Sequence, residues 1–171
     1  MSGGAFDQLK ALIVEDNPHM RVLLKSLLNA LGITKLFEAQ NGEDAFRLLR
    51  DREPDLILTD LTMHPVDGLA LVREIRTSMT SPNPYIPIIM VTGHTERHRI
   101  EAARDAGVTE ILAKPITAGN LFQRIGEILN RPRPFVKSSG YFGPDRRRHQ
   151  AADFAGPYRR RDDFENDIAI R

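Results

Sequence analysis

The first 130 residues alternate between two kinds of hydrophobic pattern. Short runs of consecutive apolar residues predict strands buried on both faces, and stretches with an apolar residue every three or four positions predict helices with one buried face. The predicted strands lie at residues 9–14, 33–39, 56–60, 86–91 and 109–113, and a helical stretch follows each of them. This strict alternation favours an α/β fold with a doubly wound parallel sheet, because right-handed crossovers with short connections leave few other arrangements.

Residues that commonly end or begin helices support these boundaries. Four of the predicted helices are preceded by a side chain that can accept a hydrogen bond from the first turn: Asn17, Asn41, Asp67 and Thr117. The helix after the fourth strand is predicted to begin at His94 or Thr95 and to end before Gly107. The third helix is predicted to face the core with Leu69, Val72, Ile75 and Met79.

Length and composition are those of one globular domain with an appendage. The chain has 171 residues, 41% hydrophobic and 27% charged, and no cysteine, which excludes disulfides, thiolate nucleophiles and cysteine zinc sites. No apolar segment approaches the ~18 residues that cross a bilayer, and the first ten residues lack the pattern of a signal peptide. We therefore expect a cytoplasmic protein without a membrane contact.

The small net charge of +1 conceals two regions of opposite sign. Residues 1–130 contain 14 Lys and Arg against 17 Asp and Glu, whereas residues 131–171 contain 10 against 6. The hydrophobic periodicity also stops after residue 130. We predict a domain at residues 1–130 and a basic, aromatic-containing tail at residues 131–171, which is too short for a winged-helix output domain.

Polar residues stand at the carboxyl ends of four predicted strands. Glu15 and Asp16 follow the first strand, Asp60 ends the third, Thr92 follows the fourth and Lys114 follows the fifth. In a parallel sheet all of these ends lie along one edge, which is where open α/β sheets bind their ligands. Each residue alone has a plainer explanation, such as a turn former at Asp60 or Thr92 or a surface lysine at Lys114.

Together these residue types suit chemistry on a phosphoryl group. Carboxylates that lie close together repel unless one is protonated or a cation sits among them, and an all-oxygen set suits Mg²⁺. A carboxylate at Asp60 could attack phosphorus, while Lys114 and a metal neutralise the phosphoryl oxygens and Thr92 donates a hydrogen bond.

Four motifs along the chain resemble those of the receiver domain of bacterial two-component response regulators, of the chemotaxis-regulator type. They are VEDNP, LILTDLTMHPVDG, PIIMVTGHT and AKPI, and the resemblance covers residues 9–130. It implies a flavodoxin-like, five-stranded sheet in the order 2-1-3-4-5, which is the order found in chemotaxis receivers.

The resemblance also implies roles for single residues. Asp60 matches the phospho-acceptor, and Glu15, Asp16 and the backbone carbonyl of Thr62 match the other protein ligands of Mg²⁺. Thr92 and Lys114 match the hydroxyl and the ammonium that contact the phosphoryl group. The positions expected to tune or transmit phosphorylation are Thr62, Thr92, Gly93, His94, Ile111 and Pro115, the last following a peptide bond that is cis in the family.

The chain departs from the family pattern in three places. Ile111 stands where the family usually has a switch Tyr or Phe, so another group is expected to report phosphorylation. His64-Pro65 shifts the usual proline of the loop by one residue, and the proline-rich segment at 80–87 is longer than usual.

The tail contains an approximate repeat, FGPDRRR at residues 142–148 and AGPYRRR at residues 155–161. Its aromatic residues could anchor the tail to the acidic body of its own or a neighbouring chain, or to a partner. Its arginines offer donors to carboxylates or phosphates: Arg146, Arg147, Arg148, Arg159, Arg160 and Arg161. A solvated, disordered tail is the alternative. Acidic residues interspersed among the arginines oppose nucleic-acid binding.

The function predicted from the sequence is a phosphorylation switch. A sensor histidine kinase or phosphotransfer protein passes a phosphoryl group to Asp60 with Mg²⁺, and the output is contact with a downstream protein, with a homodimer left open. Turnover would be limited to slow self-hydrolysis, so no enzyme is expected. Two alternatives stay open: an adaptor that acts through its tail without phosphorylation, and a Mg²⁺-dependent phosphatase with Asp60 as nucleophile.

Overall fold

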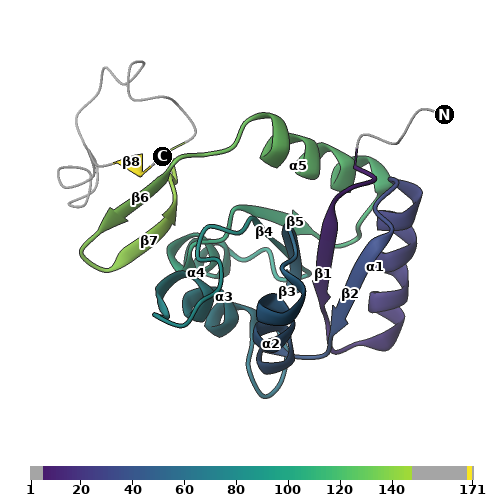
Figure 1. The fold of residues 1–171 in the computed structure, drawn as a ribbon, viewed down its shortest axis with the longest axis horizontal. Helices are drawn as coiled ribbons and strands as arrows, with labels where there is room; N and C mark the ends of the chain where they lie inside the picture. The colour runs from purple at the N-terminus through teal and green to yellow at the C-terminus, as the bar shows by residue number, and fades with distance from the viewer. Residues whose placement is uncertain (1–5, 148–168, 171) are drawn as a thin grey trace.

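A parallel sheet forms the centre of the computed structural model, which describes residues 6–147 and 169–170. The five strands lie in the order β2-β1-β3-β4-β5 (Figure 1). The strands are β1 (Lys10–Val14), β2 (Lys35–Ala39), β3 (Leu56–Asp60), β4 (Ile88–Thr92) and β5 (Glu110–Ala113). The helices that alternate with them are α1 (Pro18–Ala30), α2 (Gly42–Arg52), α3 (Gly68–Thr77), α4 (Arg97–Ala106) and α5 (Ala118–Asn130). The doubly wound fold expected from the sequence is confirmed.

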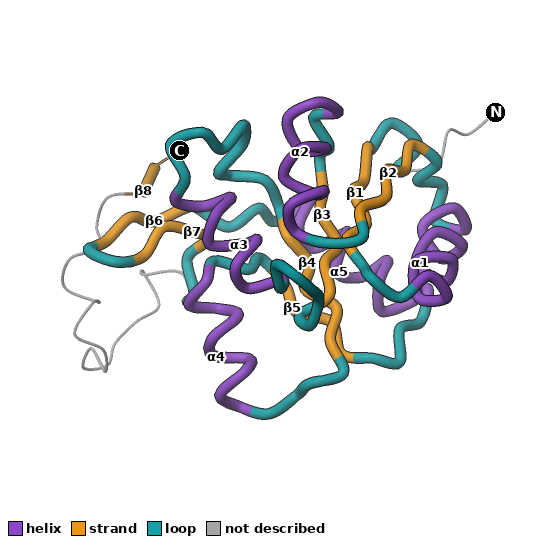
Figure 2. The backbone as a smooth tube through the Cα atoms, turned by 90° about the horizontal axis from the view of Figure 1, so that it is seen from below, coloured by secondary structure: helices purple, strands orange, loops and turns teal. Residues whose placement is uncertain are grey.

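Helices cover both faces of the sheet and divide the core into two apolar layers. One layer packs α1 and α5 against one face, and the other packs α2, α3 and α4 against the opposite face (Figure 2). Successive residues of β1 show why the strands are apolar throughout: Leu12 belongs to one layer and Ile13 to the other. Because side chains alternate across a strand, a two-sided sheet needs apolar residues at consecutive positions.

The predicted capping residues hold the starts of four helices. Asn17 Oδ1 accepts hydrogen bonds from the backbone N–H groups of His19 and Met20, and Thr117 forms a reciprocal capping pair with Asn120. Asn41 and Asp67 cap α2 and α3 in the same way. The predicted start of α4 was wrong by two or three residues, since α4 begins at Arg97 after Glu96, which makes no side-chain capping bond.

The C-terminal end of α3 also differs from the prediction. Met79 is fully exposed, because Ser78 adopts an extended conformation and the helix ends at Thr77. The buried residue at this end is Arg76, of which 3% is exposed. Its Nε donates to the carbonyl of Gly107 at 3.0 Å and its Nη1 donates to the carbonyl of Pro84 at 2.7 Å, so it links α3 to two loops.

The tail contains a β-hairpin that the hydrophobic pattern did not predict. Strands β6 (Phe135–Ser138) and β7 (Tyr141–Pro144) pair antiparallel, with Gly140 at a positive φ in the turn, and β8 (Ala169–Ile170) pairs with β6. Both ribbon views place the hairpin beside α3 and α4, away from α1 (Figures 1 and 2). The rings of Phe135 and Phe142 pack against each other and against Tyr85.

Gly68 marks a close approach between α3 and the end of β3. A Cβ atom at Gly68 would lie 2.0 Å from the backbone oxygen of Asp60, whereas a Cβ at Gly93 would meet nothing within 4 Å. We expect Gly68→Ala to lower the free energy of unfolding by about 1–3 kcal/mol, because backbone must move to relieve the clash. Gly93→Ala is the control, and its free energy of unfolding, measured by urea denaturation, should equal that of the wild type. Equal midpoints for the two variants would contradict this packing.

Candidate functional site

The ends of β1, β3 and β5 bring three acids and a lysine together at one edge of the sheet. One carboxylate oxygen from each of Glu15, Asp16 and Asp60 lies within 4.8 Å of the others. Lys114 Nζ lies 3.6 Å from Asp60 Oδ1 and 3.7 Å from Glu15 Oε2. Residues that are as much as 99 positions apart in the sequence therefore share one site, as the strand-end argument predicted.

Asp60 is held in place but remains accessible. The backbone N–H of Leu61 donates to its Oδ1 at 2.8 Å, and 12% of its side chain is exposed. Thr92 lies at the end of β4, one residue beyond the partner of Asp60 in the register, and is buried. Thr92 Oγ1 accepts a hydrogen bond from the N–H of His94 at 2.9 Å. At this solvent-accessible edge of the sheet, Asp60 Oδ1 therefore faces the ammonium group of Lys114.

Burial raises the pKa of Glu15 from 4.5 to about 7, and the negative charge of Asp60 contributes in the same direction. A hydrogen bond from the N–H of Asn17 and the charge of Lys114 act against this rise without cancelling it. Only 2% of the Glu15 side chain is exposed. The site therefore contains an acid whose pKa lies near neutral pH, because burial disfavours its charged form.

These residues fit a divalent cation. Glu15 Oε2 is buried without a hydrogen-bond partner, so it is an acceptor that the described residues do not satisfy. The cluster offers oxygen ligands only, and hard cations such as Mg²⁺ prefer oxygen ligands. The predicted acid set Glu15, Asp16 and Asp60 is brought together, whereas Thr62 lies in the exposed loop after β3, where its carbonyl stays a predicted ligand.

Arg21 is a component of the site that the sequence analysis missed. Its Nη1 donates to the backbone oxygens of Glu15 at 2.8 Å and Asp16 at 3.4 Å, and its Nε lies 3.5 Å from a carboxylate oxygen of Glu38. The guanidinium thus fixes the backbone that carries both acids without contacting their carboxylates. The position of Arg21 in the sequence, one turn into α1 and just after the two acids, was the signal that could have indicated this role.

We expect Arg21→Met to weaken Mg²⁺ binding about tenfold, because groups that position metal ligands commonly have effects of this size. Isothermal titration calorimetry with MgCl₂ measures the affinity directly. Arg50→Met, on the exposed side of α2, removes the same charge elsewhere and is the control. Equal weakening by both variants would indicate a general charge effect and contradict a positioning role for Arg21.

The positions expected to tune phosphorylation lie on β4 or β5 or in the loops that follow β3, β4 and β5. Gly93 is exposed after β4, and His94 Nδ1 lies 3.8 Å from a carboxylate oxygen of Glu96. Ile111 is half-buried on β5 and packs against the layer under α2, α3 and α4. The peptide bond between Lys114 and Pro115 is cis, and so is the bond between His64 and Pro65. Their proposed effects on the phosphoryl group stay predictions.

The structure describes two of the six tail arginines singled out in the sequence. Arg146 pairs with Asp105 of α4, and its guanidinium lies 4.4 Å from the centre of the Tyr141 ring. Arg147 Nε lies 3.3 Å from a carboxylate oxygen of Asp145. The others lie outside the described residues: Arg148, Arg159, Arg160 and Arg161.

The sequence matches the response regulator receiver domain family over residues 11–126. The chemotaxis protein CheY of Pseudomonas aeruginosa is 36% identical over 123 residues, which are 72% of this chain and 98% of the relative. The chemotaxis protein CheY-3 of Vibrio cholerae is 33% identical over 123 residues, which are 72% of this chain and 93% of the relative.

Solved structures show the same fold. A response regulator from Chloroflexus aurantiacus superposes with a TM-score of 0.66 at 28% identity, over 72% of this chain and 98% of the other. The chemotaxis protein CheY4 of Vibrio cholerae superposes with a TM-score of 0.64 at 25% identity, over 70% of this chain and 98% of the other. Among the described residues, no helix is long and apolar enough to cross a membrane. The chain belongs to the response regulator receiver domain family and is a phospho-acceptor response regulator of a two-component system.

Proposed function

We propose that Asp60 is the phospho-acceptor and that a sensor histidine kinase or a phosphotransfer protein is the donor. The observation that carries this assignment is the position of Lys114 Nζ, 3.6 Å from Asp60 Oδ1. The Asp60 oxygen attacks phosphorus, the phosphorus–nitrogen bond of a phosphohistidine breaks, and its electron pair returns to the imidazole of the donor. The product is an acyl phosphate on Asp60.

The surrounding residues stabilise this transfer by their charge and position. Lys114 neutralises negative charge on the transferred oxygens, and Thr92 supplies a hydroxyl at the neighbouring strand end. Mg²⁺ held by Glu15, Asp16 and Asp60, with the Thr62 carbonyl, would supply further positive charge at the phosphoryl group. Asp16 is exposed, so the acid cluster can be reached from solvent.

The phosphodonor would dock beside α1. This helix begins at Pro18, directly after the acid loop, and two of its apolar side chains face solvent, with Val22 63% and Leu23 42% exposed. A donor that reaches Asp60 must cover part of this surface, and exposed apolar side chains would contribute to its binding. Sensor kinases present their phosphohistidine in the cytoplasm, which is where we place this protein.

The output would be a change at the surface formed by α4 and β5, read by a downstream protein. Thr92 precedes the loop that leads into α4, and Lys114 directly follows β5, so both elements adjoin the site. We expect no multiple-turnover activity, because the acyl phosphate is lost only by slow hydrolysis. A homodimer stays a prediction.

Acetyl phosphate with Mg²⁺ tests the assignment without a partner protein. We expect the intact mass of the wild type to rise by one phosphoryl group and that of Asp60→Asn to stay unchanged. Asp51→Asn, an exposed acid on α2, should be modified like the wild type. Modification of Asp60→Asn to the same extent would refute the acceptor role, and repeated release of phosphate from p-nitrophenyl phosphate would identify the chain as a phosphatase instead.

A further inference from the structure

The connection between β2 and α2 contacts both backbone segments that adjoin the acid site. The carbonyl of Ala39, the last residue of β2, accepts a hydrogen bond from the N–H of Glu15 at 3.1 Å. Three residues later, the N–H of Gly42 donates to the carbonyl of Val66 at 3.4 Å. Val66 belongs to residues 61–67, which join β3 to α3 and which we call the β3–α3 loop. One short connection therefore contacts the backbone of the acids and the backbone of this loop.

The β3–α3 loop is held at both of its ends and near its middle. The N–H of Gly68 donates to the carbonyl of Leu61 at 3.0 Å, which closes the loop. The side chain of Met63 is 1% exposed and packs in the apolar layer under α2, α3 and α4. Val66 is half-buried and accepts the hydrogen bond from α2. These contacts restrain the backbone around Thr62, whose carbonyl is a predicted ligand of the cation.

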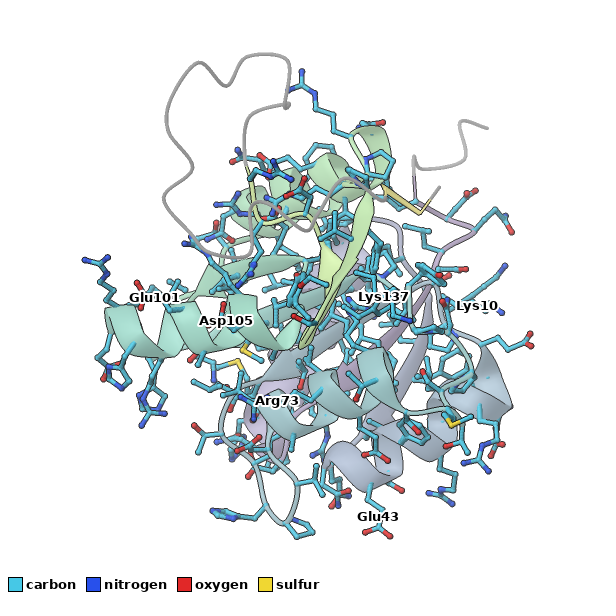
Figure 3. The ribbon with its side chains drawn as sticks, turned by 90° about the vertical axis from the view of Figure 1, so that its left-hand side faces the viewer. Lys10, Glu43, Arg73, Glu101, Asp105 and Lys137 are labelled. Atoms are coloured by element: carbon cyan, nitrogen blue, oxygen red, sulfur yellow. The ribbon has the colours of Figure 1, made fainter. Side chains whose placement is uncertain are left out.

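Gly42, the first residue of α2, is buried and has no room for a side chain. A Cβ there would lie 2.6 Å from Val66 Cγ1 and 3.3 Å from Leu71 Cβ. Two carbon atoms repel strongly at 2.6 Å, so Val66 and the loop would have to move. The hydrogen bond to Val66 has a local cause as well, because N–H groups in the first turn of a helix have no acceptor within that helix. Figure 3 marks this end of α2 with Glu43, which points into solvent.

A shift of the β3–α3 loop would change the coordination that the site can offer to a divalent cation. Mg²⁺ requires near-octahedral coordination by oxygen atoms at about 2.0–2.1 Å, so ligands from separate segments must keep a fixed spacing. Arg21 and Ala39 hold the backbone of Glu15, whereas Gly42 holds the β3–α3 loop. A displacement of the loop alone would therefore move the Thr62 carbonyl relative to the acids and leave the acids in place.

We propose that Gly42 and Val66 are positioning residues for the divalent cation, because their contact sets the spacing between the β3–α3 loop and the acids after β1. This inference rests on the proposed function, since the cation is the one that the phosphoryl transfer would use. Both residues act through the backbone of the loop. Gly42 contributes its N–H and the space left by its missing side chain, and Val66 contributes its carbonyl and its Cγ1 atom.

Isothermal titration calorimetry of the full chain with MgCl₂ tests this role without a phosphoryl donor. We expect Gly42→Ala to raise the Kd about tenfold, because the added methyl group displaces Val66 and the loop. Gly126→Ala on α5 is the matched control, since a Cβ there would lie an unstrained 3.9 Å from Asn130 Nδ2. The control should keep the Kd within about twofold of the wild-type value.

Val66→Ala distinguishes a positioning contact from a general loss of stability. Alone it removes the contact without a clash, so we expect the Kd to rise by about threefold. Combined with Gly42→Ala it removes the Cγ1 atom and leaves Val66 Cβ at 3.0 Å, so the double variant should bind Mg²⁺ about threefold more tightly than Gly42→Ala alone. Two independent losses of stability would add instead. In the metal-free proteins, the changes in amide NMR shift should be largest at residues 61–67.

Three results would overturn the proposal: wild-type affinity of Gly42→Ala, additive effects in the double variant, or equal weakening by Gly126→Ala. If Gly42→Ala does not fold, wild-type affinity of Val66→Ala overturns it. Absence of Mg²⁺ binding by the wild type overturns it as well. The acceptor role fails separately, because acetyl phosphate would then modify wild type and Asp60→Asn alike, while the Mg²⁺ affinities of the Gly42 and Val66 variants would still decide the role of this contact.

Discussion

A chain that ends after Asn130 is expected to unfold with a free energy about 3 kcal/mol lower than that of the full chain. A chain that ends after Arg147 keeps the hairpin and should lose about 1 kcal/mol or less, since the pairing that it loses among the described residues is the short one of β8 with β6. Urea denaturation followed by far-ultraviolet circular dichroism measures both differences. The difference in free energy of unfolding between the two shortened chains measures the contribution of the hairpin separately from that of the rest of the basic tail.

The loss follows from what the hairpin buries. Val136 and Tyr141 are 6% and 8% exposed, and a fully buried large apolar side chain contributes about 1.5–3 kcal/mol. The Phe135 ring lies 5.0 Å from the guanidinium carbon of Arg76 and is lost with the hairpin. Two effects offset part of this loss: the hairpin residues regain conformational freedom, and Arg76 regains contact with water.

Equal stability of the two shortened chains would show that the hairpin contributes nothing to the fold. It would also support the domain boundary at residue 130 that the hydrophobic pattern predicted. A large difference would instead place the end of the cooperative unit at or beyond β7.

Glu15→Gln is expected to stabilise the metal-free protein at pH 8 by up to about 3 kcal/mol and to have little effect at pH 4.5. The pKa of Glu15 is about 7 in the fold and 4.5 as its ordinary value. The folded protein therefore binds the proton more tightly than the unfolded chain does. Stability is lost as the pH rises from 4.5 to about 7, because each pKa unit of difference corresponds to about 1.4 kcal/mol. Gln stays neutral and avoids this loss.

Urea midpoints of both proteins between pH 4.5 and 8, in buffer with a chelator, test this expectation. Glu43→Gln removes an exposed acid from α2 and should follow the wild type at every pH (Figure 3). Millimolar Mg²⁺ should reverse the order at pH 8, since the wild type keeps a ligand that the variant has lost. Parallel curves for wild type and Glu15→Gln without Mg²⁺ would mean that Glu15 is not a buried, proton-binding acid.

The sequence alone was enough for the parallel sheet and for bringing three acids and a lysine together at its edge. Consecutive apolar residues at β1, β3 and β4 required a sheet covered on both faces, and the polar residues after the strands had to meet at one edge. The predicted caps Asn17, Asn41, Asp67 and Thr117 were also confirmed, because a cap depends on contacts within a few residues.

Only the tertiary structure revealed the parts that depend on contacts between distant segments. The burial of Arg76 depends on Gly107, Pro84 and Phe135, and the hairpin depends on the surface of α3 and α4 that it covers. Two strands of four residues are too short to show a period of their own, so their burial could not be predicted locally. Local patterns determined the alternation of strands and helices and placed the acids and the lysine at the ends of strands. The packing of remote segments decided where the hairpin lies and how little water reaches Glu15, because burial is a property of the assembled chain.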